Sequence, residues 1–106
     1  MNFVNLTPHE LNIIVDDDET INIESTGEVA RVDQSTEQSD PLDGIPVQLV
    51  EMQEIINLPE PEAGTVFIVS GIVEANTNRA DIYSPGPLVR DDDGKPVGCE
   101  GLKQTV

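Results

Sequence analysis

The residues best suited to covalent or proton-transfer chemistry are a single cysteine, Cys99, and a single histidine, His9, in a chain of 106 residues. A cysteine with a histidine as its base is a common pair for nucleophilic catalysis. However, no local signature of a cysteine enzyme surrounds Cys99, and a lone cysteine is commonly a small buried hydrophobic residue. We therefore expect that the protein is not an enzyme.

Metal and phosphate chemistry have little support in the sequence. The run from Asp91 to Gly94 resembles part of a calcium loop, but an EF-hand frame with its glycine at Gly94 places Val89 where the first aspartate belongs. One histidine and one cysteine leave a closed zinc site dependent on carboxylates. Both glycine-rich phosphate-binding motifs are missing. We expect no metal and no cofactor.

The few basic residues mark the best candidate for a binding site. Arg79 and Arg90 each lie close to an aspartate and flank a rigid turn that runs from Tyr83 to Pro87. Each arginine has two alternatives: it pairs with the local carboxylate, or its planar guanidinium recognises an anion or a protein partner. The predicted site for a ligand or partner consists of Arg79, Asp81, Tyr83, Arg90, Asp91 and His9.

The net charge is the most unusual property of the chain, with 21 acidic residues against 5 basic ones and a formal charge of -16. Such a charge repels nucleic acid and anionic membranes, so we expect neither as a direct partner. Two explanations remain: adaptation to high salt, and mimicry of a polyanion that inhibits a nucleic-acid-binding host protein. The acidic residues are spread from Glu10 to Glu100, which favours salt adaptation.

The aliphatic residues predict a mainly β, α+β fold. Val and Ile together number 22, against 11 for Leu and Ala, and residues branched at Cβ suit strands better than helices. The length fits one domain covering 1–106. We expect a small antiparallel sheet arranged as a sandwich or a partly open barrel.

The local patterns place the elements of that sheet. Alternation predicts a hairpin over 11–24 and a second one over 88–102, with an extended segment over 45–56. The run TVFIVS, at 65–70, suits a strand buried on both faces, and Ser70 is a candidate start for one short helix near 70–77. The polar stretch 34–44 predicts a long mobile loop.

The cellular setting follows from what the chain lacks. Its first residues have no basic segment followed by an apolar one, and no apolar run approaches the length of a membrane span. A single cysteine gives no sign of an oxidising compartment. We expect an intracellular protein in the cytoplasm, with no membrane partner.

Two short stretches carry a family resemblance: Asn5-Leu6-Thr7-Pro8-His9 near the start, and Leu88-Val89-Arg90-Asp91 followed by Gly98-Cys99 near the end. With these, the chain resembles small, largely uncharacterised proteins of tailed phages, prophages and some bacteria and archaea. Its acidic, lysine-poor composition is similar to that of proteins from haloarchaea or their viruses. The resemblance implies a virus-related setting and no particular chemistry.

That setting leaves two non-enzymatic functions, apart from polyanion mimicry. An accessory protein that binds a host protein or a small molecule should be self-contained, with one complementary site. A minor virion component should have long arms or exposed apolar edges that become ordered in an assembly. The few aromatic residues and the absence of long apolar surfaces in the sequence favour the self-contained binder.

Overall fold

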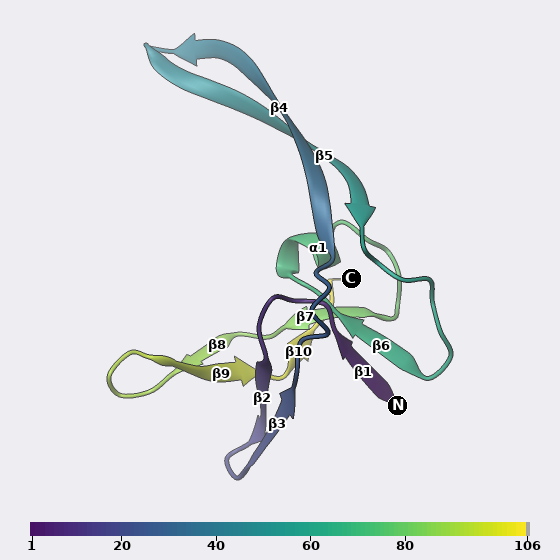
Figure 1. The fold of residues 1–106 in the computed structure, drawn as a ribbon. Helices are drawn as coiled ribbons and strands as arrows, with labels where there is room; N and C mark the ends of the chain where they lie inside the picture. Colours follow the sequence, from purple (N-terminus) through teal and green to yellow (C-terminus); the bar gives the residue numbers. More distant parts are fainter. Residues whose placement is uncertain (106) are drawn as a thin grey trace.

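Extended chain dominates the computed structural model, which describes residues 1–105 (Figure 1). The mainly β prediction with one short helix is confirmed. The elements in chain order are β1 (Asn2–Asn5), β2 (Leu11–Asp16), β3 (Glu19–Ile23), β4 (Arg31–Leu42), β5 (Ile45–Ile56), β6 (Thr65–Ile68), α1 (Gly71–Ala75), β7 (Ile82–Pro85), β8 (Leu88–Arg90), β9 (Pro96–Glu100) and β10 (Leu102–Lys103).

The first sheet has the strand order β1-β6-β7-β10, with the predicted buried strand β6 near its middle. β1, β6 and β7 are parallel, and β10 is antiparallel to β7. The pairing is therefore mixed, whereas the sequence predicts a purely antiparallel sheet. The reason is that α1 lies between β6 and β7, which gives the chain the crossover that parallel neighbours need.

The second sheet joins the two predicted hairpins in the order β3-β2-β9-β8. β2 pairs with β3 and β8 pairs with β9, both antiparallel, so both hairpins are confirmed. The hairpins meet through β2 and β9, which run parallel, with Ile13 opposite Cys99. The second sheet thus brings the start of the chain against its last fifth.

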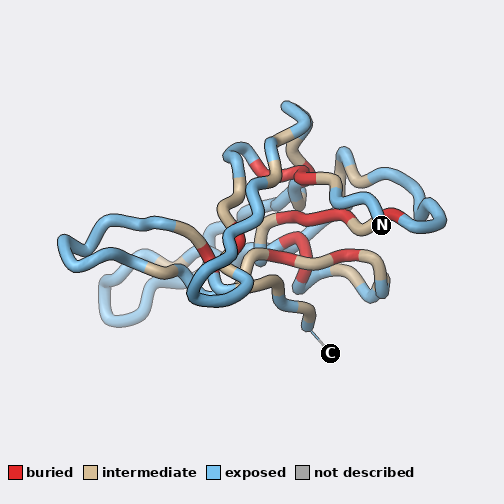
Figure 2. Tube along the Cα trace, turned by 90° about the horizontal axis from the view of Figure 1, so that it is seen from below, coloured by how far each residue is buried: buried red, intermediate tan, exposed pale blue. Residues whose placement is uncertain are grey.

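Two hydrophobic clusters hold these elements together. The buried residues gather in the middle of the molecule, and the projecting loops and hairpin ends are exposed (Figure 2). Phe67 and Val69 of the β6 segment belong to one cluster, and Ile68 between them belongs to the other. Because successive side chains of a strand point to opposite faces, β6 is buried on both sides, as its apolar run predicts. The larger cluster consists of Leu6, Ala30, Phe67, Val69, Val73 and Ile82.

The predicted helix forms at the edge of the larger cluster. Ser70 precedes it in an extended conformation, without a capping hydrogen bond from its side chain, and Asn76 follows it. Val73 is fully buried in the cluster, and the side chain of Asn76 donates to the carbonyl of Ile72 at 2.7 Å. With five residues, α1 serves to cover the core and to connect β6 with β7.

Residues 31–56 form a long two-stranded hairpin, hereafter the arm, that projects from the rest of the protein (Figure 1). The prediction of a loop over 34–44 is wrong, because residues 31–42 form β4 and pair antiparallel with β5. The turn is formed by Asp43 and Gly44, with φ angles of 49° and 82°, between the paired residues Leu42 and Ile45. Positive φ at both central residues is what a two-residue type I′ hairpin turn requires.

Candidate functional site

The arm gives the molecule its elongated shape. Its principal extents are 53 × 40 × 27 Å, and the radius of gyration of the Cα atoms is 16.8 Å. A compact chain of this length has a radius of about 13 Å. Two isolated strands of 12 residues each bury little and are of marginal stability in water. Such an element is typical of a segment that is covered by a partner.

Several large hydrophobic side chains of the arm are exposed to solvent. Leu42, Ile45 and Leu49 have exposed fractions of 69%, 65% and 56%, and Val50 and Met52 are also exposed. In the rest of the molecule such residues are scattered over separate elements, whereas here they occur within eleven consecutive positions. A concentration of exposed apolar side chains indicates an interaction surface.

The strand register sorts these side chains by face. Residues directly opposite each other in an antiparallel pair share a face, and so do alternate residues along one strand. Leu42 is paired with Ile45, and Ser39 with Val47, so one face near the tip carries an apolar stripe of four residues. This stripe consists of Leu42, Ile45, Val47 and Leu49.

Carboxylates border the stripe. Glu37 is the partner of Leu49, and Glu51 follows two positions later on the same face. The arm as a whole contains six acidic residues and one basic residue, Arg31, which lies at its base. The acidic residues are Asp33, Glu37, Asp40, Asp43, Glu51 and Glu54.

The base of the arm is fixed to the body. Val32 and Ile55, which are opposite each other, pack against the larger hydrophobic cluster. The side chain of Asn57, with a positive φ of 62°, donates to the carbonyl of Val29 at 3.2 Å and joins the two ends of the arm. The exposed part of the arm therefore extends from an anchored base.

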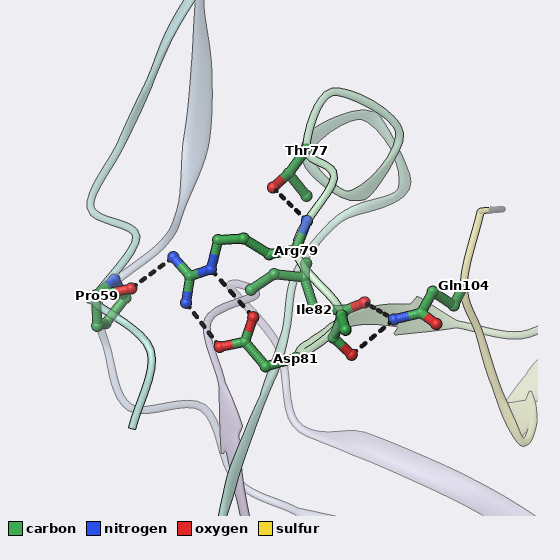
Figure 3. A network of polar contacts seen from close by, with 7 residues as sticks. Pro59, Thr77, Arg79, Asp81, Ile82 and Gln104 are labelled. Atoms are coloured by element: carbon green, nitrogen blue, oxygen red, sulfur yellow. Dashed lines mark hydrogen bonds and ion pairs between the residues drawn. The ribbon is translucent and has the colours of Figure 1, made fainter. Parts of the chain in front are cut away.

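Arg79 and Asp81, two of the predicted site residues, form a local clamp (Figure 3). Nε and Nη2 of Arg79 donate to the two carboxylate oxygens of Asp81 at 3.0 and 2.7 Å, and Nη1 donates to the carbonyl of Pro59 at 2.8 Å. The guanidinium also lies 5.8 Å from the centre of the Phe67 ring. These hydrogen bonds hold the pKa of Asp81 below its ordinary value, because they stabilise the ionised carboxylate. All of these contacts are internal, which supports the local-pairing alternative for Arg79.

Arg90 and Asp91 belong to a different network, in the turn between β8 and β9. Arg90 donates to the carbonyl of Gly94 at 2.8 Å, while a carboxylate oxygen of Asp91 accepts from the backbone N–H groups of Asp93 and Lys95, each at 2.9 Å. These contacts shape the turn itself. Among residues 1–105, no hydrogen bond or ion pair joins this network to Arg79.

Tyr83 and His9 make contacts that belong to neither arginine network. Tyr83 lies in β7 opposite Ile68, and its carbonyl accepts from the N–H of Val69 at 2.8 Å. His9 is exposed, and its carbonyl accepts from the side chain of Asn5. The six predicted site residues therefore form one ion pair, Arg79 with Asp81, one turn that contains Arg90 and Asp91 without pairing them, and two further positions, rather than one binding site.

His9 lines a cavity of about 340 Å³ that also includes Cys99. The two residues that the sequence singled out for nucleophilic catalysis thus share one cavity. Burial raises the pKa of the Cys99 thiol, so at neutral pH it is protonated and a poor nucleophile. Close backbone approach forms part of the wall, because a Cβ on Gly98 would lie only 2.5 Å from the carbonyl oxygen of Asn12. The remaining lining residues are Glu10, Leu11, Asn12, Pro85, Gly86, Leu88, Pro96 and Val97.

A buried asparagine organises the NLTPH stretch, and sequence reasoning did not single it out. Asn5 is fully buried, and its side-chain nitrogen donates to the carbonyls of His9 and Ile23 at 2.8 and 3.0 Å. Its side-chain oxygen accepts from the N–H and the hydroxyl of Thr7, at 2.9 and 2.6 Å. The NLTPH stretch is therefore a turn built around one amide side chain.

Glu74 is a second buried polar residue that the sequence did not reveal. It lies in α1 with an exposed fraction of 2%, and its carboxylate accepts from the N–H and hydroxyl of Thr105 and from the hydroxyl of Ser84. Burial raises the pKa of Glu74, but these hydrogen bonds and the nearby Lys103 outweigh it, so the pKa lies below its ordinary value. The carboxylate links the helix to the C-terminal segment.

Two other classes of site are missing from the described part of the chain. Residues 1–105 contain no cluster of three or more His, Cys, Asp or Glu side chains arranged to hold a metal ion. No helix in that range has the length and apolar character needed to cross a membrane.

Compared with protein-family models, with curated proteins and with solved structures, the chain matches none of them. The resemblance to phage and prophage proteins stays a prediction.

Proposed function

We propose that this is a non-enzymatic interaction protein that works in a protein assembly through its arm. The observation that carries the proposal is that the arm projects from an anchored base and exposes large apolar side chains along its length. Leaving these side chains in water costs hydrophobic free energy that a partner would recover. The arm contributes little to the core beyond Val32 and Ile55, so stability of the body does not account for its length.

The arm also bears on the choice between the two virus-related functions. A self-contained binder should have one complementary site, and an assembly component should have long arms or exposed apolar edges. The hairpin of residues 31–56 has the second kind of feature. We accordingly propose a structural component of an assembly ahead of a self-contained accessory binder.

Photo-crosslinking tests the proposed function. A benzophenone amino acid is placed at Leu49 of the full chain, expressed in its native cell, with the same substitution at Val15 in β2 as the control. The two positions are matched in exposure, at 56% and 51%. We expect a defined protein adduct from position 49 and none from position 15. Equal labelling at both positions, or no adduct from position 49, contradicts the proposal.

The virion alternative has its own test, since it depends on the resemblance to phage proteins. If the assembly is a virus particle, mass spectrometry of purified particles should find the chain at a fixed ratio to the major capsid protein. A chain with residues 34–52 replaced by Asn-Gly should be missing from those particles while still accumulating in the cell. Incorporation of the shortened chain would contradict docking through the arm.

A further inference from the structure

The structure also indicates what kind of surface the arm contacts, an inference that rests on the proposed function. The apolar stripe occupies one face of the arm near its tip, and two of its residues, Leu42 and Ile45, are about two-thirds exposed. On the opposite face the pairs are Gln38 with Gln48 and Thr36 with Val50, so that face is mostly polar. A partner that covers the face with the stripe therefore buries more apolar surface than one that covers the opposite face.

The carboxylates that border the stripe favour a partner with positive charge. A hollow of about 370 Å³ lies on the arm beside the stripe, where Leu49 meets two carboxylate residues, Glu37 and Glu51. Within residues 1–105, neither carboxylate takes part in an ion pair, and the nearest basic residue in the arm is Arg31 at its base. Lysine and arginine combine an aliphatic stem with a charged head, which suits a hollow with both apolar and acidic walls. The rest of its lining is Ser35, Thr36 and Val50.

A second copy of the chain is a poor occupant for this face. Each copy has a formal charge of -16, and opposed arms would bring carboxylates against carboxylates.

We propose that the apolar stripe and its bordering carboxylates form a docking face for a protein partner that presents basic side chains around an apolar centre. The stripe supplies the buried contact, and Glu37 and Glu51 pair with the basic side chains at its border. Charge complementarity of this kind selects the partner and accelerates its approach more than it strengthens the final complex. Added salt should therefore weaken binding.

The test uses the fluorescent heptapeptide Lys-Ser-Leu-Ser-Leu-Ser-Lys as the probe, because in an extended conformation it presents two leucine side chains flanked by two ammonium groups on one face. Fluorescence anisotropy measures its binding to the full chain between 0.1 and 1 M KCl. We expect Leu49→Ser to weaken binding about tenfold, the change expected when one leucine side chain no longer becomes buried. Glu37→Gln with Glu51→Gln should weaken binding and reduce its dependence on salt.

Two controls separate the docking face from the general acidity of the chain. Met52→Ser changes an exposed apolar residue on the opposite face of the arm, and Glu28→Gln with Glu62→Gln removes two exposed carboxylates outside the arm. Both controls should bind the probe like the unaltered chain. If they lose as much affinity as the docking-face variants, the probe responds to net charge and the inference is overturned.

Analytical ultracentrifugation of the same proteins distinguishes a wrong partner from a wrong function. If the chain self-associates more strongly as salt increases, and Leu49→Ser abolishes that association, the occupant is a second copy. This result overturns the basic partner but leaves the arm as the interaction element. If neither the probe nor a second copy depends on the arm, and position 49 also gives no crosslink, the proposed function fails as well.

Discussion

At the scale of single residues, the most informative side chain is Asn5, which satisfies four backbone and hydroxyl groups from a fully buried position. We expect Asn5→Ala to lower the free energy of unfolding by about 2–4 kcal/mol, because it removes the side-chain donor to the Ile23 carbonyl, one of the two donors to the His9 carbonyl, and the acceptor for the N–H and hydroxyl of Thr7. Urea denaturation followed by circular dichroism measures the change. Asn2→Ala, at an exposed position of the same strand, is the matched control and should change stability by less than about 0.5 kcal/mol.

The alternative Asn5→Asp separates packing from hydrogen bonding at the same position. Aspartate has nearly the same shape and still accepts from Thr7, but it cannot donate to the carbonyls of His9 and Ile23. It should therefore destabilise the protein at neutral pH. If the Asn5→Asp variant were as stable as the unaltered chain, the donated hydrogen bonds would contribute nothing, and our explanation of the NLTPH turn would be wrong.

Glu74 gives the molecule a pH dependence. Its pKa in the folded protein lies below its ordinary value, so the ionised carboxylate stabilises the fold above about pH 4.3, the unfolded value. This contribution is lost as pH falls from that value through the folded pKa. We expect Glu74→Gln to destabilise the protein by about 1–2 kcal/mol at pH 7, with the difference from the unaltered chain narrowing below pH 4. Denaturant melts at pH 7, 5 and 3 measure it.

The comparison variant for Glu74 is Glu28→Gln, at an exposed position. It should have little effect on stability at any of these pH values. The pKa of Asp81 is also lowered, so Asp81 makes the stability of both variants fall in acid. Only the difference in stability between the Glu74→Gln and Glu28→Gln variants therefore reports on Glu74. A Glu74→Gln effect that stays constant from pH 7 to pH 3 would contradict the role of the ionised carboxylate.

At the scale of elements, the sequence predicts the buried strand β6 and both short hairpins, but it fails for β7, whose residues it assigns to a rigid turn, and for the exposed arm. The strand at 65–68 is recognisable because its run of apolar residues is buried on both faces. β4 is different, since both of its faces are in water and its sequence, RVDQSTEQSDPL, has no apolar alternation to detect. The composition of this segment indicates a loop. The only local sign of a hairpin is the Asp43-Gly44 dipeptide, which is typical of a type I′ hairpin turn.

The candidate site was missed for the same physical reason. The sequence points to Arg79 and Arg90 because basic residues are rare. In the structure, however, Arg79 donates hydrogen bonds to Asp81 and Pro59, and Arg90 donates to the carbonyl of Gly94 within its own turn. Nothing in the composition of residues 34–52 identifies an exposed docking face. Only the pairing of β4 with β5 aligns the apolar residues into one stripe.

Gly44 tests whether the turn specifies the arm. Its φ of 82° is strained for a residue with a side chain, so Gly44→Val should cost the turn about 1 kcal/mol or more. Hydrogen exchange with mass spectrometry should then show faster exchange in peptides from residues 34–52. Exchange in β6 should be unchanged, because the turn lies at the far end of the arm and belongs to neither hydrophobic cluster (Figure 1). Equal protection of the arm before and after the change would contradict this prediction.

At the scale of the whole molecule, the arm determines the dimensions. Replacing residues 34–52 by Asn-Gly keeps Val32 and Ile55, which pack on the core. We expect the radius of gyration to fall from near 16.8 Å to about 12 Å, the value for a compact chain of the remaining length. Small-angle X-ray scattering measures the change, and the thermal midpoint of the shortened chain should stay within a few degrees. A radius that hardly changes would mean that in solution the arm folds back on the body.

The charge of the molecule predicts how its stability responds to salt. With a formal charge of -16 and a single ion pair in residues 1–105, most carboxylates repel one another. The screening length falls from about 10 Å at 0.1 M salt to about 3 Å at 1 M, so added KCl should remove most of this repulsion. We expect the thermal midpoint to rise by about 5 °C or more over that range, equivalent to about 1 kcal/mol for a domain of this size. Circular dichroism melts across a KCl series measure it.

A charge-reduced variant shows whether this salt effect is electrostatic. Asp17→Asn, Glu28→Gln and Glu62→Gln together remove three exposed carboxylates outside the arm. If repulsion is the cause, this variant is more stable than the unaltered chain at low salt and gains less from KCl. If both proteins gain equally, salt acts by strengthening hydrophobic burial instead. A midpoint that is high and unaffected by salt would mean that the carboxylates do not limit stability, and the acidic border of the arm would then be better explained by a basic partner than by adaptation to salt.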